Sequence, residues 1–216
     1  EDALTKDEAI EILNDKSNIH HELEISMVEK GPKAYSTAGW LGLTDEEISK
    51  TIKEMQSQGF DCFKMKVGQN LTDDLERLAF IRGIIGNENK LMLDCNQIWG
   101  VDEAIDYMME LKEFKPVWIE EPTARDDIQG HIKISAALKK YGIGVASGEQ
   151  VPSPVIFKQL LQAGAVGYCQ IDATRLGGVN DVLAVILLAK KYDVPVCPHG
   201  GGIGLCNMIV HYAIWD

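Results

Sequence analysis

Short apolar runs alternate with longer amphipathic stretches along most of this chain. Runs rich in Val, Ile, Phe and Cys predict buried β-strands at 34–40, 60–67, 91–96, 117–120, 143–148, 167–172 and 195–198. Apolar residues at helical spacing predict helices between them, at 44–58, 73–85, 101–111, 128–140, 155–163 and 179–192. Strand–helix repetition with nearly continuous apolar strands is typical of a parallel sheet covered by helices.

Charged and amide side chains stand at the carboxyl ends of six of these strands, about 27 residues apart. They are Lys64 and Lys66, Asp94 and Asn96, Glu120 and Glu121, Glu149, Asp172, and His199. In a doubly wound sheet, only the strand ends at the switch point converge on a ligand. In a (β/α)8 barrel, all the ends form a ring around one ligand. The pattern therefore favours a TIM-like barrel.

A complete barrel has eight strands in about 250 residues, whereas this chain of 216 residues shows seven predicted strands. Either one strand is hidden in the pattern, or the chain is a truncated form without the last strand. We place the incomplete barrel at residues 31–216. Residues 1–30 read as a helical lead-in, with helical patterns over Lys6–Leu13 and Ile19–Val28.

Charge and composition exclude several kinds of partner. Lys plus Arg number 21 against 33 Asp plus Glu, a net charge of −12, so nucleic acid and anionic membranes are unfavourable partners. No apolar run approaches the roughly 20 residues that span a bilayer. The five cysteines include no C-x-x-C pair, and the chain opens on Glu1-Asp2 without a signal peptide. We expect a soluble, intracellular, reduced protein.

Three acidic residues occupy the same position in consecutive strand–helix units: Asp94, Glu120 and Glu149. Carboxylates that converge repel one another unless a cation joins them. All-oxygen ligands suit Mg²⁺, so we predict a magnesium site. The alternative is that each acid is a solvated loop residue or a local ion-pair partner.

Two further pairs could transfer protons. Lys64 and Lys66 point to one face of their strand, and crowding their charges favours a neutral lysine that acts as a base. Asp172 can orient His199 for acid–base catalysis. The alternatives are exposed strand lysines and a structural histidine. The remaining histidines lie in helical stretches and receive no role: His20, His21, His131 and His211.

The ordered motifs resemble the mandelate-racemase subgroup of the enolase superfamily. The resemblance is carried by 39–42 (GWLG), 118–123 (WIEEPT), 157–163 (FKQLLQA) and 199–206 (HGGGIGLC). It implies Mg²⁺ bound by Asp94, Glu120 and Glu149, Lys66 as base, Lys64 as its electrostatic partner, and a His199–Asp172 dyad on the opposite substrate face. It also implies substrate contacts for Trp40, Lys64, Asn96, Glu149 and His199. The resemblance finds no N-terminal capping domain or final-strand Glu in these 216 residues, so we expect this chain alone to show little or no activity.

Within that subgroup the sequence is similar to L-fuconate dehydratases, which implies Mg²⁺-dependent dehydration of a sugar acid to a 2-keto-3-deoxy acid. One alternative is a racemase or epimerase of a 2-hydroxy acid. Another is a truncated, non-catalytic regulatory or binding form. An animal relative of these dehydratases is mitochondrial, which would imply that location here. The expected partner is a small sugar acid, and homo-oligomerisation stays open.

Overall fold

The computed structural model describes residues 2–15 and 20–216. Its main element is a six-stranded sheet in the order β1-β2-β3-β4-β5-β6, so that each strand is bonded to the next one in the sequence. The pairs from β1 to β5 are parallel. A doubly wound sheet reverses its order at a switch point. This order has no reversal, which confirms the barrel-type sheet expected from the strand ends.

The strands are short and lie inside the predicted apolar runs. They are β1 (Ser36–Gly39), β2 (Cys62–Lys66), β3 (Lys90–Asp94), β4 (Trp118–Glu120), β5 (Gly144–Ser147) and β6 (Tyr168–Cys169). Side chains that alternate with the charged ones form the core against the helices. These include Phe63, Met65, Leu93 and Ile119, all fully buried.

The last predicted strand, at 195–198, forms an isolated parallel bridge between Cys169 and Val196 instead of a regular strand. Its backbone still follows β6, because Cys169 N donates to Pro195 O and Cys197 N donates to Cys169 O. Pro195 and Pro198 have no N–H groups to offer a ladder. Residues 195, 197 and 199 bond to the β6 segment, so only Pro195 withholds an N–H group from this ladder.

The helices agree closely with the predicted ranges. They are α1 (Lys6–Asp15), α2 (His20–Lys30), α3 (Asp45–Ser57), α4 (Leu71–Ile85), α5 (Val101–Leu111), α6 (Ile128–Lys139), α7 (Pro154–Gln162), α8 (Val179–Lys191) and α9 (Leu205–Trp215), with a 3-10 turn, η2 (Lys112–Phe114). Thr44 begins α3 through a capping box with Glu47. The predicted lead-in helices appear as α1 and α2, while residue 1 and residues 16–19, including Ile19, lie outside the described residues.

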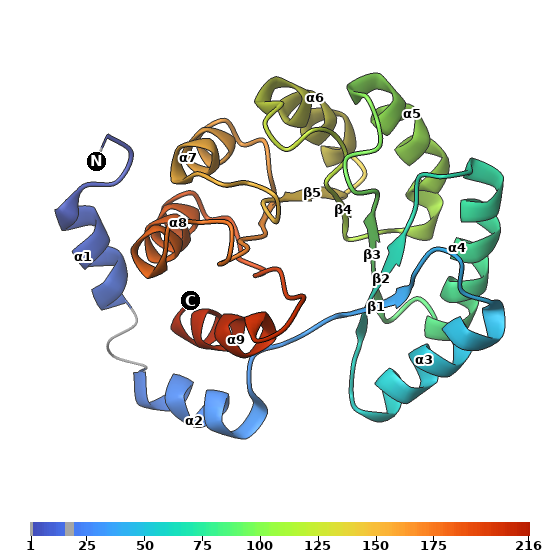
Figure 1. Cartoon of the computed structure of the whole chain (residues 1–216), viewed down its shortest axis with the longest axis horizontal. Helices are drawn as coiled ribbons and strands as arrows, with labels where there is room; N and C mark the ends of the chain where they lie inside the picture. The colour runs from blue at the N-terminus through green and yellow to red at the C-terminus, as the bar shows by residue number, and fades with distance from the viewer. Residues whose placement is uncertain (1, 16–19) are drawn as a thin grey trace. The chain divides into compact units, whose positions relative to one another are not determined.

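The chain divides into two compact units. We call Ala34–Ala146 the central unit and Glu1–Lys33 with Ser147–Asp216 the terminal unit. In the central unit, α3 to α6 lie outside the strands that they connect (Figure 1). In the terminal unit, α1 packs against α8, where Lys191 Nζ lies 2.6 Å from Glu8 Oε1.

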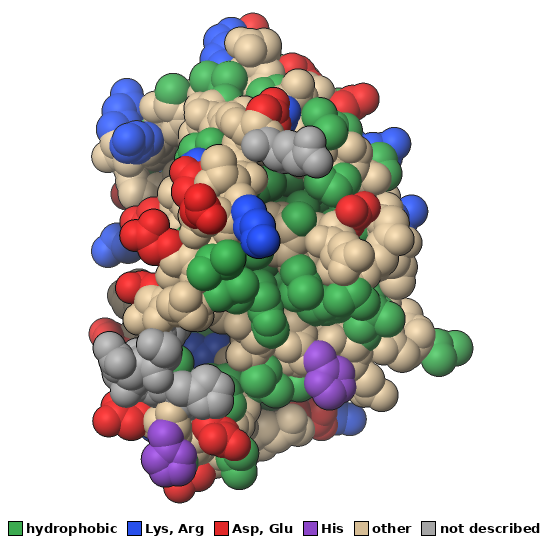
Figure 2. Space-filling model, turned by 90° about the vertical axis from the view of Figure 1, so that its left-hand side faces the viewer, with side chains coloured by type: hydrophobic (Ala, Val, Ile, Leu, Met, Phe, Trp, Pro, Cys, Tyr) green, Lys and Arg blue, Asp and Glu red, His purple; other side chains and the backbone are tan. Residues whose placement is uncertain are grey.

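Some large apolar side chains of the terminal unit are exposed. Leu13 of α1 and Val28 of α2 are 53% and 82% exposed, and α9 exposes Ile214 and Trp215. Figure 2, which views the side of the molecule where α1 lies, shows hydrophobic side chains gathered on that face. Among the described helices, none is both long enough and apolar enough to cross a membrane.

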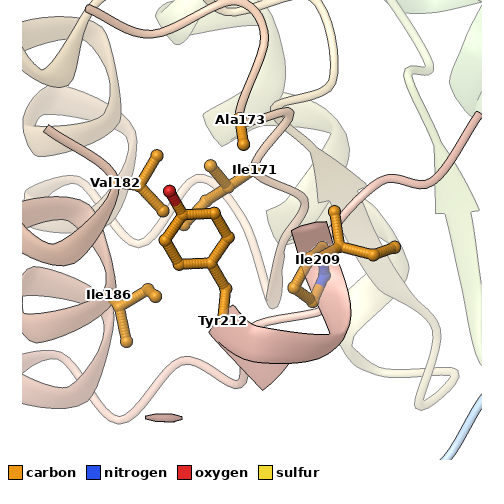
Figure 3. Close-up of a pocket in the computed structure, with 7 residues that line it drawn as sticks. Ile171, Ala173, Val182, Ile186, Ile209 and Tyr212 are labelled. Atoms are coloured by element: carbon orange, nitrogen blue, oxygen red, sulfur yellow. The ribbon is translucent and has the colours of Figure 1, made fainter. Parts of the chain in front are cut away.

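The terminal unit also has a small, partly open apolar pocket without room for a water molecule. Its lining is Ile171, Ala173, Val182, Ile186, Pro198, Ile209 and Tyr212. Figure 3 shows the Tyr212 ring between the side chains of α8 and the Ile171–Ala173 segment. The lining carries no charged group, so it can support the neighbouring Asp172 and His199 by packing but cannot bind an acid anion.

Candidate active site

Neighbouring strand ends of the central unit bring charged side chains to one level of the sheet. Lys66 of β2 is the register partner of Asp94 of β3, and Asp94 is the partner of Glu120 of β4. Lys64 shares the face of Lys66 because alternate residues of a strand point the same way. The structure therefore brings these predicted site residues together, and we call Lys64, Lys66, Asp94 and Glu120 the lysine–carboxylate cluster.

The lysine–carboxylate cluster consists of buried ion pairs. Lys64 Nζ lies 2.5 Å from Glu120 Oε1 and 2.9 Å from Asp94 Oδ2. Lys66 Nζ lies 2.5 Å from the same Asp94 oxygen and 2.7 Å from Asn96 Oδ1. Asp94 and Glu120 are fully buried and Lys64 is 5% exposed. Each charge therefore depends on its partners, because water cannot replace them.

Burial and ion pairing act in opposite directions on the pKa values of the cluster. Burial lowers the pKa of Lys64, but Glu120 and Asp94 outweigh that effect and hold it above the ordinary value. Burial raises the pKa of Asp94, but Lys64 and Lys66 reverse that effect and hold it below its ordinary range. Lys64 is therefore a cation here, which suits contact with a substrate anion rather than the role of a neutral base.

The loops that follow β3 and β4 carry strained backbone. Asn96, Gln97 and Glu121 have φ angles of 50°, 64° and 46°, a region that residues with side chains adopt rarely. Glu121 accepts hydrogen bonds from Gln97 Nε2 at 2.8 Å and from Asn96 Nδ2 at 3.5 Å. Such strain is concentrated at functional sites. Here it holds the Asn96 side chain within reach of Lys66.

Trp40, a predicted substrate contact, directly follows β1 and covers Lys66. The Lys66 Nζ atom lies 5.2 Å from the centroid of the Trp40 ring, within the range of a cation–π interaction. Trp40 is 53% exposed. It therefore presents an aromatic surface to solvent beside the predicted base.

The predicted Asp172–His199 dyad is formed within the terminal unit. His199 Nδ1 lies 3.0 Å from Asp172 Oδ2. The other oxygen, Asp172 Oδ1, accepts from Thr174 N at 2.7 Å and from Thr174 Oγ1 at 2.6 Å. Burial raises the pKa of Asp172, but the Thr174 bonds and His199 outweigh it and hold the pKa below its ordinary value. Asp172 is therefore an anion in a fixed orientation.

The second nitrogen of His199 also faces a carboxylate. His199 Nε2 lies 3.3 Å from Glu149 Oε2, and the His199 side chain is 27% exposed. Glu149 therefore lies beside the nitrogen that Asp172 leaves for proton transfer. Both ring nitrogens of His199 therefore face carboxylate oxygens, Asp172 Oδ2 on one side and Glu149 Oε2 on the other.

The three predicted magnesium ligands are divided between the units, with Asp94 and Glu120 in the central unit and Glu149 in the terminal unit. Among residues 2–15 and 20–216, no group of three His, Cys, Asp or Glu side chains is arranged to hold a metal ion. The donor chemistry nevertheless fits Mg²⁺, because Asp94 and Glu120 are buried oxygen donors on register-paired strand ends. The ligand set therefore stays a prediction.

Sequence reasoning missed several residues that hold the site in place. Thr174 fixes Asp172 through both its N–H and its hydroxyl group, and the Asp-x-Thr spacing is a local signal that could have revealed it. Gln97, and Arg77, whose Nη1 donates to the main-chain carbonyl of Lys66, left no such signal. Their partners come from distant segments, as with the bond from Gln97 to Glu121, so only the folded chain identifies them.

Comparison with known proteins places this arrangement in a family. The family described as "Enolase C-terminal domain-like" matches residues 47–215. Mitochondrial enolase superfamily member 1 of Bos taurus is 50% identical over 216 residues, which is 100% of this chain and 49% of that protein. L-galactonate dehydratase of Hypocrea jecorina is 48% identical over 219 residues, covering 100% of this chain and 49% of that protein.

Solved structures agree with these sequence relatives. The crystal structure of human mitochondrial enolase superfamily member 1 matches with a TM-score of 0.96 and 49% identity, over 100% of this chain and 49% of that one. L-talarate dehydratase from Polaromonas sp. JS666, crystallised with Mg and L-glucarate, matches with a TM-score of 0.76 and 28% identity, over 84% and 50% of the two chains. The chain spans about half the length of the curated relatives it matches. It belongs to the enolase C-terminal domain-like family and has that family's TIM-barrel-like fold.

Proposed function

We propose that this chain carries the reaction centre of a Mg²⁺-dependent acid-sugar dehydratase. The observation that carries the proposal is the Asp172–His199 hydrogen bond at 3.0 Å in a chain that also buries Lys66 beside Asp94. Dehydration of a sugar acid needs one group that removes the α-proton and another that protonates the departing β-hydroxyl. A lysine and a carboxylate-bound histidine can perform these two tasks. The L-galactonate dehydratase among the relatives supports the same reaction class.

Asp94, Glu120 and Glu149 are the residues that we propose to hold the metal. Asp94 and Glu120 are fully buried and Glu149 is 6% exposed, so their charges cannot be screened well by water. The chemistry supplied by bound Mg²⁺ is the neutralisation of negative charge that develops on the substrate carboxylate. The proposal is supported by the L-talarate dehydratase from Polaromonas, which was crystallised with Mg and L-glucarate.

The residues of the chain then divide the proton transfers. Lys66, an ion-pair partner of Asp94 in the resting structure, must first release a proton to solvent. Its Nζ then takes the α-proton, and the carbon–hydrogen electron pair becomes a carbon–carbon double bond as the β-carbon–oxygen bond breaks. His199, oriented by Asp172, gives its Nε2 proton to the leaving hydroxyl, which departs as water. The enol product takes up a proton at the β-carbon and becomes a 2-keto-3-deoxy acid. Lys64 binds the substrate carboxylate as a cation, beside Asn96 and Trp40.

The proposed substrate class is a sugar acid of L-galacto configuration. L-fuconate, suggested by the sequence motifs, is 6-deoxy-L-galactonate, so the two acids share their configuration at carbons 2 to 5. The relative from Hypocrea jecorina bears the name of an L-galactonate dehydratase. The proposal therefore covers both acids and leaves the group at carbon 6 as the variable part.

Location and assembly belong to the same proposal. The name of the bovine relative supports a mitochondrial location. The exposed apolar side chains of α1, α2 and α9 are compatible with association of several copies.

The decisive experiment is a product screen with the protein at its natural length. L-galactonate, L-fuconate, talarate and galactarate are each incubated with Mg²⁺, and 2-keto-3-deoxy acid is measured. We expect product from an acid of L-galacto configuration, loss of turnover after chelation of the metal, and recovery when Mg²⁺ is added back. Deuterium from D₂O in recovered substrate without keto acid would instead identify a racemase or epimerase. If none of the four acids forms keto acid or takes up deuterium, the result would favour a non-catalytic protein.

A further inference from the structure

An arginine of the central unit, Arg77, joins the carboxyl ends of β1 and β2. The end of β2 carries the predicted base Lys66, and Trp40, which covers Lys66, directly follows β1. Arg77 lies in α4, and its Nη1 donates to the main-chain carbonyl of Lys66 at 3.0 Å. Its Nη2 donates to the carbonyls of Gly39 at 3.1 Å and Trp40 at 2.9 Å. A single planar guanidinium group thus fixes the backbone at both residues. We call these three contacts the Arg77 clamp.

The Arg77 clamp is itself held from behind by a buried carboxylate. Asp74 is 1% exposed and lies 3.3 Å from Arg77 Nη1. It also accepts hydrogen bonds from Gly68 N at 2.6 Å and from the hydroxyl group of Tyr107 at 2.8 Å. Because Asp74 makes all three contacts, the guanidinium has one well-defined position.

The position of the clamp matters because Trp40 and Lys66 meet directly. The Trp40 ring covers Lys66 Nζ at 5.2 Å, although Trp40 is 53% exposed and follows the end of β1. Because the Arg77 guanidinium holds the main-chain carbonyls of Lys66 and Trp40 together, it fixes the distance between the side chains of these two residues. We propose that Arg77 is a positioning residue, which sets Lys66 and Trp40 for proton abstraction in the dehydration proposed above.

A second arginine on the same helix provides a matched comparison. Arg82 donates to the carbonyls of Gly86 and Asn89 through Nη1 and to the carbonyl of Phe114 through Nη2. These carbonyls precede β3 and β4, whereas the Arg77 clamp lies at the carboxyl ends of β1 and β2. Active sites of such barrels lie at the carboxyl ends of the strands, and residues at the other end serve stability. Arg82 therefore has the same chemistry without access to the site.

The test compares Arg77→Met with Arg82→Met in the protein at its natural length. We expect Arg77→Met to lower kcat by about 10²-fold, the loss associated with small misplacements of reacting groups, while KM changes less. Arg82→Met should lower the melting temperature but leave the kcat of the folded protein within about twofold. Arg77→Lys, which keeps one donor group, should recover part of the lost kcat.

A second measurement separates this inference from the proposed reaction. Amide hydrogen exchange over residues 36–43 should increase in Arg77→Met and stay unchanged in Arg82→Met. If the unsubstituted protein dehydrates no sugar acid, the proposed function fails, and this exchange result alone decides whether the clamp exists. Unchanged exchange, or an unchanged kcat in a protein that does turn over, would overturn the inference.

A milder variant covers the case in which Arg77→Met does not fold. Tyr107→Phe removes one hydrogen bond to Asp74 and leaves Arg77 in place. We expect a several-fold loss of kcat and faster exchange at residues 36–43, with little change in KM. A Tyr107→Phe protein with unchanged kcat and unchanged exchange would contradict the chain of contacts from Tyr107 through Asp74 to Arg77.

Discussion

The two units hold their charged residues in different ways. In the central unit, the lysine–carboxylate cluster has two cations and two anions whose side chains are between 0% and 11% exposed. In the terminal unit, His199 is 27% exposed and lies between Glu149 and Asp172. The lysine–carboxylate cluster consists of mutually dependent ion pairs. The site in the terminal unit consists of the His199 imidazole between two carboxylates, and water can reach it.

This difference predicts different consequences of substitution. Removing one partner of a buried ion pair leaves a charge that water cannot solvate, so stability and chemistry change together. Removing a partly exposed histidine leaves carboxylates that water can partly solvate, so chemistry changes more than stability. Substitutions in both units can therefore confirm or break the comparison.

The largest effect is expected on the two proton transfers. Lys66→Ala and His199→Asn should each lower keto-acid formation by about 10² to 10⁴-fold, the contribution of a positioned acid or base. Lys66→Ala should also abolish exchange of the substrate α-proton with D₂O. His199→Asn should retain part of that exchange, because the proposed base for the α-proton is Lys66. Mass spectrometry of recovered substrate measures the exchange.

Equal loss of α-proton exchange in both variants would break this division of labour. One residue would then serve both steps, and the contrast between the two units would have no catalytic meaning.

The next effect is on stability. Lys64→Met leaves Glu120 and Asp94 with only Lys66 as a cation, and should lower the free energy of unfolding by about 3–5 kcal/mol. Urea unfolding followed by circular dichroism measures the change. The control is Lys133→Met, since Lys133 and Asp102 form a pair at 2.5 Å with side chains 61% and 80% exposed. That variant should lose at most about 1 kcal/mol.

Similar losses in Lys64→Met and Lys133→Met would show that burial does not make the cluster interdependent. The comparison between the units would then rest on chemistry alone.

Much of the fold could be predicted because its signals are local. Apolar runs of strand length and amphipathic helices gave the order of elements, and the spacing of polar strand ends gave the sequential sheet. The prediction of a regular strand at 195–198 was wrong, since only a single bridge forms there, and Pro195 has no N–H group to extend the ladder.

The site could be predicted as far as strand alternation, the polar residues at strand ends and the family resemblance reach. Alternation placed Lys64 with Lys66, and the strand-end position selected Asp94, which the structure pairs in register with Lys66. It could not show that Asp94 would bond both lysines, nor that His199 Nε2 would face Glu149. Those contacts depend on side-chain rotamers and on backbone from distant segments.

Thr174 allows a smaller test within the terminal unit. Thr174→Val removes the hydroxyl donor to Asp172 Oδ1 but keeps the backbone N–H bond. A hydrogen bond to a charged group contributes about 1.5–3 kcal/mol, so a roughly tenfold or larger loss of kcat is expected as the Asp172–His199 pair loosens. Thr174→Ser keeps the hydroxyl group and should retain most of the activity. Equal losses in Val and Ser variants would assign the effect to packing of the methyl group instead.

The smallest effect concerns a histidine that contrasts with His199. His131 in α6 is fully buried, its Nδ1 lies 2.8 Å from the Asp127 carbonyl oxygen, and its Nε2 has no partner among the described residues. Burial lowers the pKa of His131, and the Asp127 carbonyl opposes this only in part. The folded chain therefore favours neutral His131, whereas the unfolded chain takes up a proton near pH 6.5.

This contribution to stability is complete above about pH 6.5 and is lost as the pH falls toward the lower pKa of the folded state, with a slope of at most about 1.4 kcal/mol per pH unit. The free energy of unfolding should therefore fall less steeply between pH 7 and pH 5 in His131→Gln than in the unsubstituted protein. His21→Gln is the control, because the His21 side chain is 85% exposed and its loss should leave the slope unchanged. A slope that is the same with and without His131 would mean that this ring is solvated or paired in solution. The contrast between buried His131 and carboxylate-bound, water-accessible His199 would then fail, because His131 would not differ from a solvated or paired histidine.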